Sequence, residues 1–130
     1  MSTLRSAMNA ADRYREGLEV RRSVLGSEYV ANALADAENP SALQRMVTEF
    51  GWGFVWARDE LPRQTRSLLT VALLTALNRP HELLAHVRGA VRNGCTREQI
   101  EEAVLHCAAY CGLPAAIDAM RVVEQALAES

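Results

Sequence analysis

Helix-breaking residues divide this 130-residue chain into intervals that each have the length of one helix. The breaks fall at Gly26, Asn39-Pro40, Leu61-Pro62, Arg79-Pro80, Asn93-Gly94 and Gly112 to Pro114. Glycine and proline are strong signals for the end of a helix, and the intervals between them lack the strict alternation that is typical of strands. We therefore predict helices over residues 3–24, 27–37, 41–57, 62–78, 80–93, 97–111 and 113–128. This pattern indicates an all-α bundle in a single domain, residues 1–130.

Two of these helices have unusual apolar patterns. Residues 67–77 (SLLTVALLTAL) are apolar nearly all round, so we expect a central helix that is covered on every side. Helix 41–57 has two apolar faces. One face carries Leu43, Met46, Val47, Phe50 and Phe54, and the other carries Trp52 and Trp56. One face belongs to the core, and the second is expected to form a pocket wall or a contact with another subunit. Gly51 and Gly53 indicate close backbone packing or a bend there.

The charge and the cysteines exclude several classes of protein. The net charge is −2, and the 14 basic residues are scattered, so no nucleic-acid surface is expected. No apolar run approaches the roughly 20 residues that span a bilayer, and the first residues lack a signal-peptide core. We therefore expect a cytoplasmic protein without membrane contact. Its thiols, Cys95, Cys107 and Cys111, are expected to be reduced and to lie in the core.

The most chemically dense segment begins in helix 80–93. There Leu83, Leu84, Val87, Ala90 and Val91 form an apolar side, and Glu82, His86, Gly89 and Asn93 form a separate polar stripe. Glu82 and His86 are therefore neighbours one turn apart, either as a catalytic pair or as an ordinary surface pair. Thr96 and Gln99 predict a capping box that opens the next helix, and Gly94 suits a left-handed turn before it.

His106 lies at the margin of the apolar stripe of helix 97–111, where it is either a substrate contact or a packing residue. A metal site made of His81, His86 and His106 is conceivable from the residue types. No further carboxylate or cysteine stands at ligand spacing, so we expect no metal site.

Four segments resemble the carboxymuconolactone decarboxylase family: Arg21 to Val30, Trp52 to Arg58, Arg66 to Ala72 and Glu82 to Ala116. The resemblance implies an all-helical enzyme that needs no cofactor and assembles as a ring-shaped hexamer. It also implies the decarboxylation of 4-carboxymuconolactone to 3-oxoadipate enol-lactone, a step of protocatechuate catabolism through β-ketoadipate. The partner is then a small dicarboxylate lactone.

The wider superfamily contains alkylhydroperoxidase-like proteins, which use a C-x2-C dithiol followed by a histidine on the next turn. His86 matches that histidine, and Arg79 and Glu82 stand where the cysteines would be. The missing dithiol argues against a thiol peroxidase or reductase. A helical oligomer that binds a small acid without turning it over is the remaining alternative.

Loss of CO2 from such a lactone leaves an extended enolate, which needs an oxyanion donor and a proton donor for carbon. We assign His86 as general acid or oxyanion donor, with Glu82 orienting it or shuttling the proton. Arg58 is the first candidate for binding the carboxylate that stays, and Arg66 is the second. Trp52 and Trp56 would supply an apolar wall for the carboxylate that leaves. The alternatives are helix-end charges for the arginines and core packing for the tryptophans.

Overall fold

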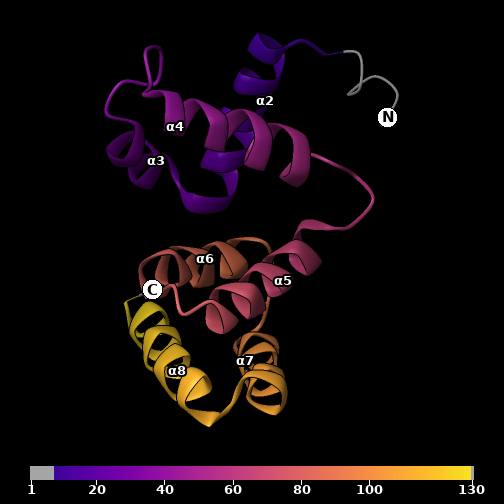
Figure 1. Ribbon diagram of the computed structural model, residues 1–130, viewed down its shortest axis with the longest axis vertical. Helices are drawn as coiled ribbons and strands as arrows, with labels where there is room; N and C mark the ends of the chain where they lie inside the picture. The colour runs from indigo at the N-terminus through magenta and orange to yellow at the C-terminus, as the bar shows by residue number, and fades with distance from the viewer. Residues whose placement is uncertain (1–7, 130) are drawn as a thin grey trace. The chain divides into compact units, whose positions relative to one another are not determined.

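The computed structural model describes residues 8–129, which form helices joined by short connections (Figure 1). The elements are α2 (Ala10–Leu25), α3 (Ser27–Leu34), α4 (Ala42–Met46), the π-helix η1 (Val47–Trp56), α5 (Arg63–Ala76), α6 (Pro80–Arg92), α7 (Arg97–Cys111) and α8 (Leu113–Ala128). No strand is present between residues 8 and 129, so the prediction of an all-α chain is confirmed. The chain divides into two compact units, Met1–Pro62 and Arg63–Ser130.

Local signals determined most helix ends. Gly26, Gly94 and Gly112 have φ angles of 91°, 91° and 96°, which glycine adopts without strain. The side chain of Thr96 accepts a hydrogen bond from the Gln99 backbone, and the Gln99 side chain accepts one from the Thr96 backbone. The predicted capping box is therefore confirmed.

The first predicted helix, 3–24, is seen in the described residues as α2, which begins at Ala10 after the N-cap residue Asn9. Residues 3–7 of the prediction lie outside the described part of the chain. The Asn9 side chain accepts a hydrogen bond from the backbone of Asp12, which is the usual role of asparagine at this position.

The predicted helix 41–57 is an α-helix only as far as Met46, and it continues as the π-helix η1. The Ala57 backbone N–H, for example, donates to the Trp52 carbonyl five residues earlier. The wider turn places Thr48, Trp52, Gly53 and Trp56 together on the buried side. A period of 3.6 residues could not predict this arrangement, although Gly51 and Gly53 did signal a departure from a regular helix.

Two glycines allow α2 and η1 to cross at backbone contact. A Cβ atom at Gly17 would lie 2.2 Å from the Thr48 carbonyl oxygen, and one at Gly53 would lie 2.2 Å from the Arg13 carbonyl oxygen. A Cβ atom at Gly51 would meet no heavy atom within 4 Å. The predicted close packing is thus confirmed at Gly53, and Gly51 takes no part in it.

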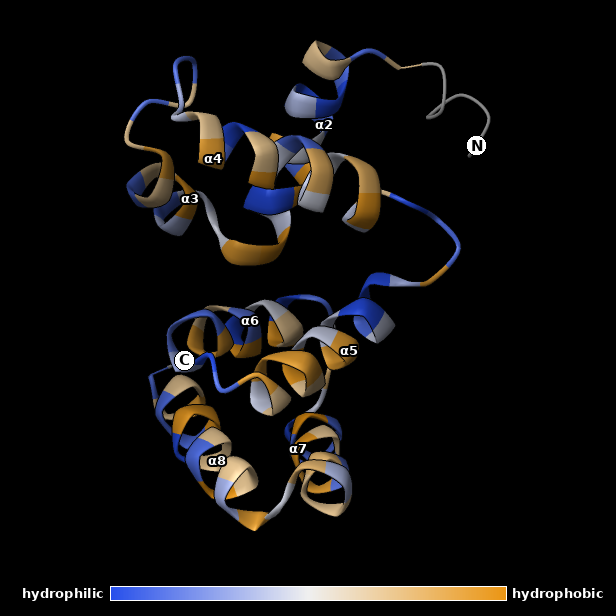
Figure 2. Cartoon of the chain, in the orientation of Figure 1, coloured by the Kyte–Doolittle hydropathy of each residue, from blue (hydrophilic) through white to orange (hydrophobic). Residues whose placement is uncertain are grey.

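The tryptophans lie in the core, and the other apolar face of this segment does not. Trp52 and Trp56 are 5% and 9% exposed, and their rings stack with centroids 5.0 Å apart. The opposite face is largely exposed along Leu43, Met46, Phe50 and Phe54. The face left to be covered is therefore the phenylalanine face, and Figure 2 shows the apolar residues along α4 and η1.

In the second unit, α5 packs against α6, α7 and α8. The core between them includes Val71, Leu83, Val87, Ala90, Ile100, Val104 and Val123. The prediction that residues 67–77 are covered on every side is wrong, because Leu69, Leu73 and Leu77 are between 49% and 60% exposed. They lie four residues apart and form one uncovered stripe on α5.

Between residues 8 and 129, no helix combines the length and apolarity that crossing a bilayer requires.

We expect Gly17→Ala and Gly53→Ala each to lower the free energy of unfolding by roughly 2 kcal/mol or more, because the new methyl group meets fixed backbone atoms. Alanine otherwise favours a helix by about 1 kcal/mol over glycine. Gly51→Ala, the matched control, should therefore be neutral or stabilising. Urea unfolding followed by circular dichroism measures all three, and equal effects in the three variants would contradict the close crossing.

Candidate functional site

The residues assigned from the sequence belong to both units of the chain. Trp52, Trp56 and Arg58 lie in or just after η1, and Arg66, Glu82, His86 and His106 lie on α5, α6 and α7.

Helix α6 carries the two residues that we assign to catalysis. Pro80 occupies its first turn, where a missing N–H costs nothing, and Glu82 lies exposed in the same turn. A carboxylate there is stabilised by the helix dipole, which gives Glu82 a structural role besides any catalytic one. His86 lies one turn further and is half-buried, with its Nδ1 atom shielded from solvent.

Beyond Glu82, the polar stripe of α6 is not the solvent side of the helix. Leu83, Val87 and Ala90 are buried as predicted, but Ala85 and Gly89, which flank His86, are buried too. Val91 and Arg92 are exposed instead. His86 is therefore in a sheltered position, which disfavours the reading of Glu82 and His86 as an ordinary surface pair.

A partly buried hydrogen bond fixes the end of α6. The Asn93 side-chain amide donates to the Ser67 hydroxyl over 2.9 Å, and Ser67 is fully buried in α5. Nearby, the Gln64 amide donates to the Gly94 carbonyl over 3.0 Å. Asn93 thus positions the helix that carries His86, a role that the polar stripe in the sequence did not reveal.

Arg58 already has a carboxylate partner. Its guanidinium lies 3.2 Å from Glu60 Oε1 and 5.7 Å from the centroid of the Phe54 ring. Both side chains of the ion pair are more than a third exposed, so the pair is weak and exchangeable. A substrate carboxylate at Arg58 would have to displace Glu60.

The other candidates for substrate binding differ in their surroundings. Arg66 is half-buried in the first turn of α5, and its Nε atom is shielded from solvent. The tryptophan pair belongs to the core, so only a small part of either ring is accessible to a ligand.

His106 is exposed beside an open hollow of about 460 Å³. The other residues lining this hollow are Leu68, Glu98, Gln99, Glu102 and Ala103. Two carboxylates beside His106 would repel a dicarboxylate, so this environment disfavours His106 as a substrate contact. Its ring is exposed and lies 5.3 Å from the Tyr110 ring, so His106 packs at the surface of α7 and not in the core.

Arg21 received no role from the sequence, although it lies in one of the segments that carry the resemblance. It is only 5% exposed, and its Nη1 atom donates to Gln44 Oε1 over 2.9 Å and to Thr48 Oγ1 over 3.2 Å. Burial lowers the pKa of its guanidinium, against an opposing effect of Tyr29 and Tyr14. Arg21 therefore ties α2 to α4 and η1.

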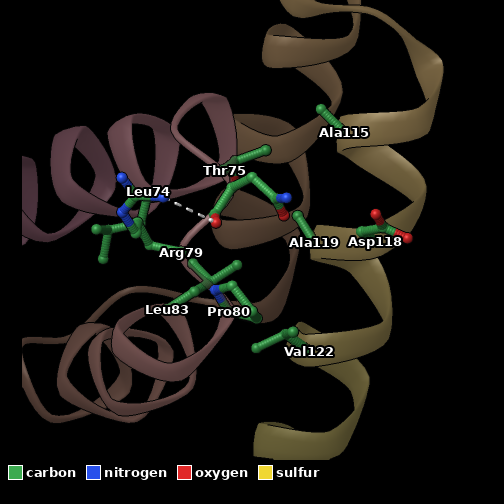
Figure 3. A pocket seen from close by; sticks show the side chains of 10 residues that line it. Leu74, Thr75, Arg79, Pro80, Leu83, Ala115, Asp118, Ala119 and Val122 are labelled. Atoms are coloured by element: carbon green, nitrogen blue, oxygen red, sulfur yellow. Dashed lines mark hydrogen bonds between the residues drawn. The ribbon is translucent and has the colours of Figure 1, made fainter.

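A small cavity lies between α5, α6 and α8 (Figure 3). Thr75, Arg79, Leu83 and Asp118 are among its lining residues. Its volume of about 10 Å³ has room for about one water molecule, far less than a lactone with two carboxylates needs. None of the residues that we assign to catalysis lines it.

Potential metal ligands do not cluster. Within residues 8–129, no group of three or more His, Cys, Asp or Glu side chains could hold a metal ion, and this includes His81, His86 and His106.

The cysteines divide into two buried thiols and one exposed thiol. Cys95 and Cys107 are buried, and burial raises the pKa of both; Cys111 raises that of Cys107 further. The Cys107 thiol donates to the Ala72 carbonyl over 3.3 Å. The expectation that Cys111 lies in the core is wrong, because it is exposed at the end of α7.

Comparison with known proteins identifies the family. Residues 41–125 match the Carboxymuconolactone decarboxylase family, and the match crosses from the first unit into the second. The chain is 44% identical to 4-carboxymuconolactone decarboxylase of Acinetobacter baylyi over 119 residues, which cover 91% of this chain and 89% of the relative. It is 48% identical to nitrosuccinic acid decarboxylase npaB of Metarhizium robertsii over 117 residues, which cover 88% of this chain and 80% of the relative.

The chain belongs to the carboxymuconolactone decarboxylase family. The resemblance seen in the sequence is thus confirmed, and so is the expectation of a carboxy-lyase at the level of the enzyme class. The two relatives act on different acids, as their names state, so the family alone does not define the substrate.

We expect alkylation of the thiols to leave activity intact. At pH 7 to 8, iodoacetamide should modify Cys111 first, because the raised pKa of Cys95 and Cys107 keeps these buried thiols protonated. Their modification should speed up only as the pH rises. Peptide mass spectrometry gives the order, and loss of turnover in parallel with modification of Cys111 would contradict a reaction that needs no thiol.

Proposed function

We propose that this chain is a carboxy-lyase that removes CO2 from a small dicarboxylic acid without a metal or an organic cofactor, and that 4-carboxymuconolactone is its substrate. The observation that carries the proposal is the sheltered position of His86 in a chain of this family. The similarity to the enzyme of Acinetobacter baylyi supports the particular substrate.

The reaction needs one electron sink and one proton. When the carbon–carboxylate bond breaks, its electron pair is delocalised through the ring double bond onto the lactone carbonyl oxygen, and CO2 leaves. Protonation of carbon then gives 3-oxoadipate enol-lactone. In this proposal His86 donates a hydrogen bond to the developing oxyanion or delivers the proton.

The remaining residues bind and orient. Glu82 lies one turn before His86 on α6, and its side chain is exposed. After the Glu82 side chain rotates inward, it can orient the His86 ring or return a proton to that ring. Arg58, or Arg66 in its place, holds the carboxylate that stays in the product. The leaving carboxylate should be left without a strong cation, since pairing it would stabilise the ground state.

Nitrosuccinic acid is the second candidate substrate, because a relative named for it is 48% identical. This acid also carries two carboxylates, and loss of the one beside the nitro group leaves a carbanion delocalised onto the nitro oxygens. The same two requirements, an oxyanion donor and a proton donor, therefore serve both acids.

The decisive experiment compares the two acids at equal enzyme concentration. Release of CO2 is measured for both, and the fall in ultraviolet absorbance for the lactone. A kcat/KM at least about 100-fold higher for the lactone, roughly 3 kcal/mol of selectivity, would support the first assignment. A preference for nitrosuccinic acid would transfer it to the second. Absence of turnover with both, alongside measurable binding, would favour the non-enzymatic acid-binding alternative.

Replacing His86 with alanine should lower kcat by roughly 10²- to 10⁴-fold, the range for loss of a positioned proton donor. Glu82→Gln should lower kcat less, because the amide can still orient the ring. His81→Ala is the matched control, since His81 is an exposed neighbour on the same helix. Circular dichroism must show unchanged helix content. A His86→Ala enzyme with the kcat of the wild type would falsify the assignment.

Arg58 and Glu60 form a matched pair of variants for substrate binding. Arg58→Ala should raise KM more than it lowers kcat if Arg58 holds the carboxylate that stays in the product. Glu60→Gln should lower KM by about two- to fivefold, because the competing carboxylate is removed from Arg58. Steady-state kinetics measures both changes. If Arg66→Ala raises KM, Arg58→Ala does not, and Glu60→Gln leaves KM unchanged, the role passes to Arg66.

We further propose that the two units are parts of one family domain and that the chain works as a cytoplasmic oligomer, with a ring-shaped hexamer as the expected form. The family match across both units supports the first point. Two uncovered apolar faces support the second. They are Leu43, Met46, Phe50 and Phe54 of the first unit, and Leu69, Leu73 and Leu77 of the second.

Light scattering should therefore show a mass well above the 14.3 kDa of one chain at micromolar concentration. Phe50→Glu, which puts a charge on the exposed face, should shift the mass downward, whereas Glu28→Gln on the exposed surface of α3 should not. A wild-type protein that remains monomeric at these concentrations would remove the support for assembly.

A further inference from the structure

A second hollow lies on the solvent side of α6, within the second unit. It has a volume of about 260 Å³ and is lined by Arg88, Val91, Arg92, Ala126, Leu127 and Glu129. Arg88 follows His86 by two residues, which places the two side chains about 200° apart around the helix. The hollow is therefore separate from the sheltered stripe that carries His86.

The lining combines cations with an apolar surface. Arg88 and Arg92 lie one turn apart at the end of α6, and Val91 lies beside them. Ala126 and Leu127 of α8 contribute further apolar surface. Guanidinium groups bind carboxylates through two parallel hydrogen bonds, and an adjacent apolar surface suits the body of a compact organic acid.

One carboxylate already lies in this hollow. Arg88 Nη2 donates a hydrogen bond to Glu129 Oε2, and Glu129 follows directly after the last residue of α8. The Glu129 side chain is about half exposed and the Arg88 side chain about a third exposed. Such a pair contributes little to stability and exchanges readily, so Glu129 marks where a ligand carboxylate would bind.

We infer that the Arg88–Arg92 hollow is a second binding site, which takes a small organic acid with one carboxylate and a compact apolar body. The ligand carboxylate replaces Glu129 at Arg88, and its apolar body lies against Val91, Ala126 and Leu127. Glu129 is then an internal competitor, and the affinity is reduced by the fraction of molecules in which it occupies Arg88.

Benzoate is a suitable probe, with benzamide as a neutral control of nearly the same shape. Methyl-resolved NMR titrations of the full chain should show shifts at Val91, Ala126 and Leu127 with benzoate and none with benzamide. A contact of this size predicts a Kd on the order of 1 mM. Glu129→Gln should tighten binding by about three- to tenfold, and Arg88→Gln should weaken it by about tenfold or more.

Two control variants separate this site from other sources of binding. Arg121→Gln removes an exposed arginine of α8 that pairs with Asp118, and it should leave the affinity unchanged. His86→Ala should also leave it unchanged, whereas benzoate bound at the candidate active site would respond to that change. This readout does not depend on turnover, so it stands or falls separately from the proposed reaction.

Three results would overturn the inference. Absence of shifts at the three methyl-bearing residues would show that the hollow takes no such acid. If Arg88→Gln binds benzoate as tightly as the wild type does, the binding is only nonspecific apolar contact. Equal affinity in Glu129→Gln would show that Glu129 does not compete for the site and would remove the observation on which the inference is based.

Discussion

The rotation of α6 about its own axis is the constraint on which the second unit depends. The hydrogen bond from Asn93 to the buried hydroxyl of Ser67 fixes one end of the helix, and Leu83, Val87 and Ala90 fix its apolar side in the core. Ser67 has no access to water, so loss of its partner would leave a buried polar group unsatisfied. The same rotation then shelters His86 and leaves Arg92 in solvent.

The orientation of each helix gives two histidines with similar sequence surroundings different environments in the structure. His86 and His106 both lie beside apolar stripes, but α7 turns His106 outward among Glu98 and Glu102. A sheltered imidazole meets a bound substrate with little competition from water, whereas the charge interactions of an exposed one are screened. The environment of each ring, rather than the number of histidines, therefore decides which one suits acid–base chemistry.

Most of the fold could be predicted because its signals are local. Gly94, Gly112 and the Thr96–Gln99 pair each act within one turn of the chain, and the helices that they bound were predicted closely. The π-helix and the burial of the tryptophans depend on the crossing with α2, some 36 residues away between Gly17 and Gly53, and no local pattern carries that information.

The candidate site shows the same limit. Helical periodicity placed Glu82 and His86 on one stripe, and membership of the family is the basis for proposing a catalytic role for them. The ion pair of Arg58 with Glu60 lies in the connection after η1, where helical periodicity predicts nothing. Arg21 is buried because α2, α4 and η1 meet around its side chain. Neither the ion pair nor the burial of Arg21 can be predicted without the three-dimensional arrangement of the side chains.

The π-helical segment also constrains how this family can be compared. Because a π-turn holds about one residue more than an α-turn, the segment behaves as though it contained an inserted residue. A relative that lacked one residue here could form a plain α-helix, and the side chains beyond the deletion would keep their places because the wider turn no longer has to take up an extra residue. Trp56 and Arg58 would then correspond to positions in that relative only across a gap of one residue. The length of this segment, as much as its residue identities, therefore determines which positions correspond between two members.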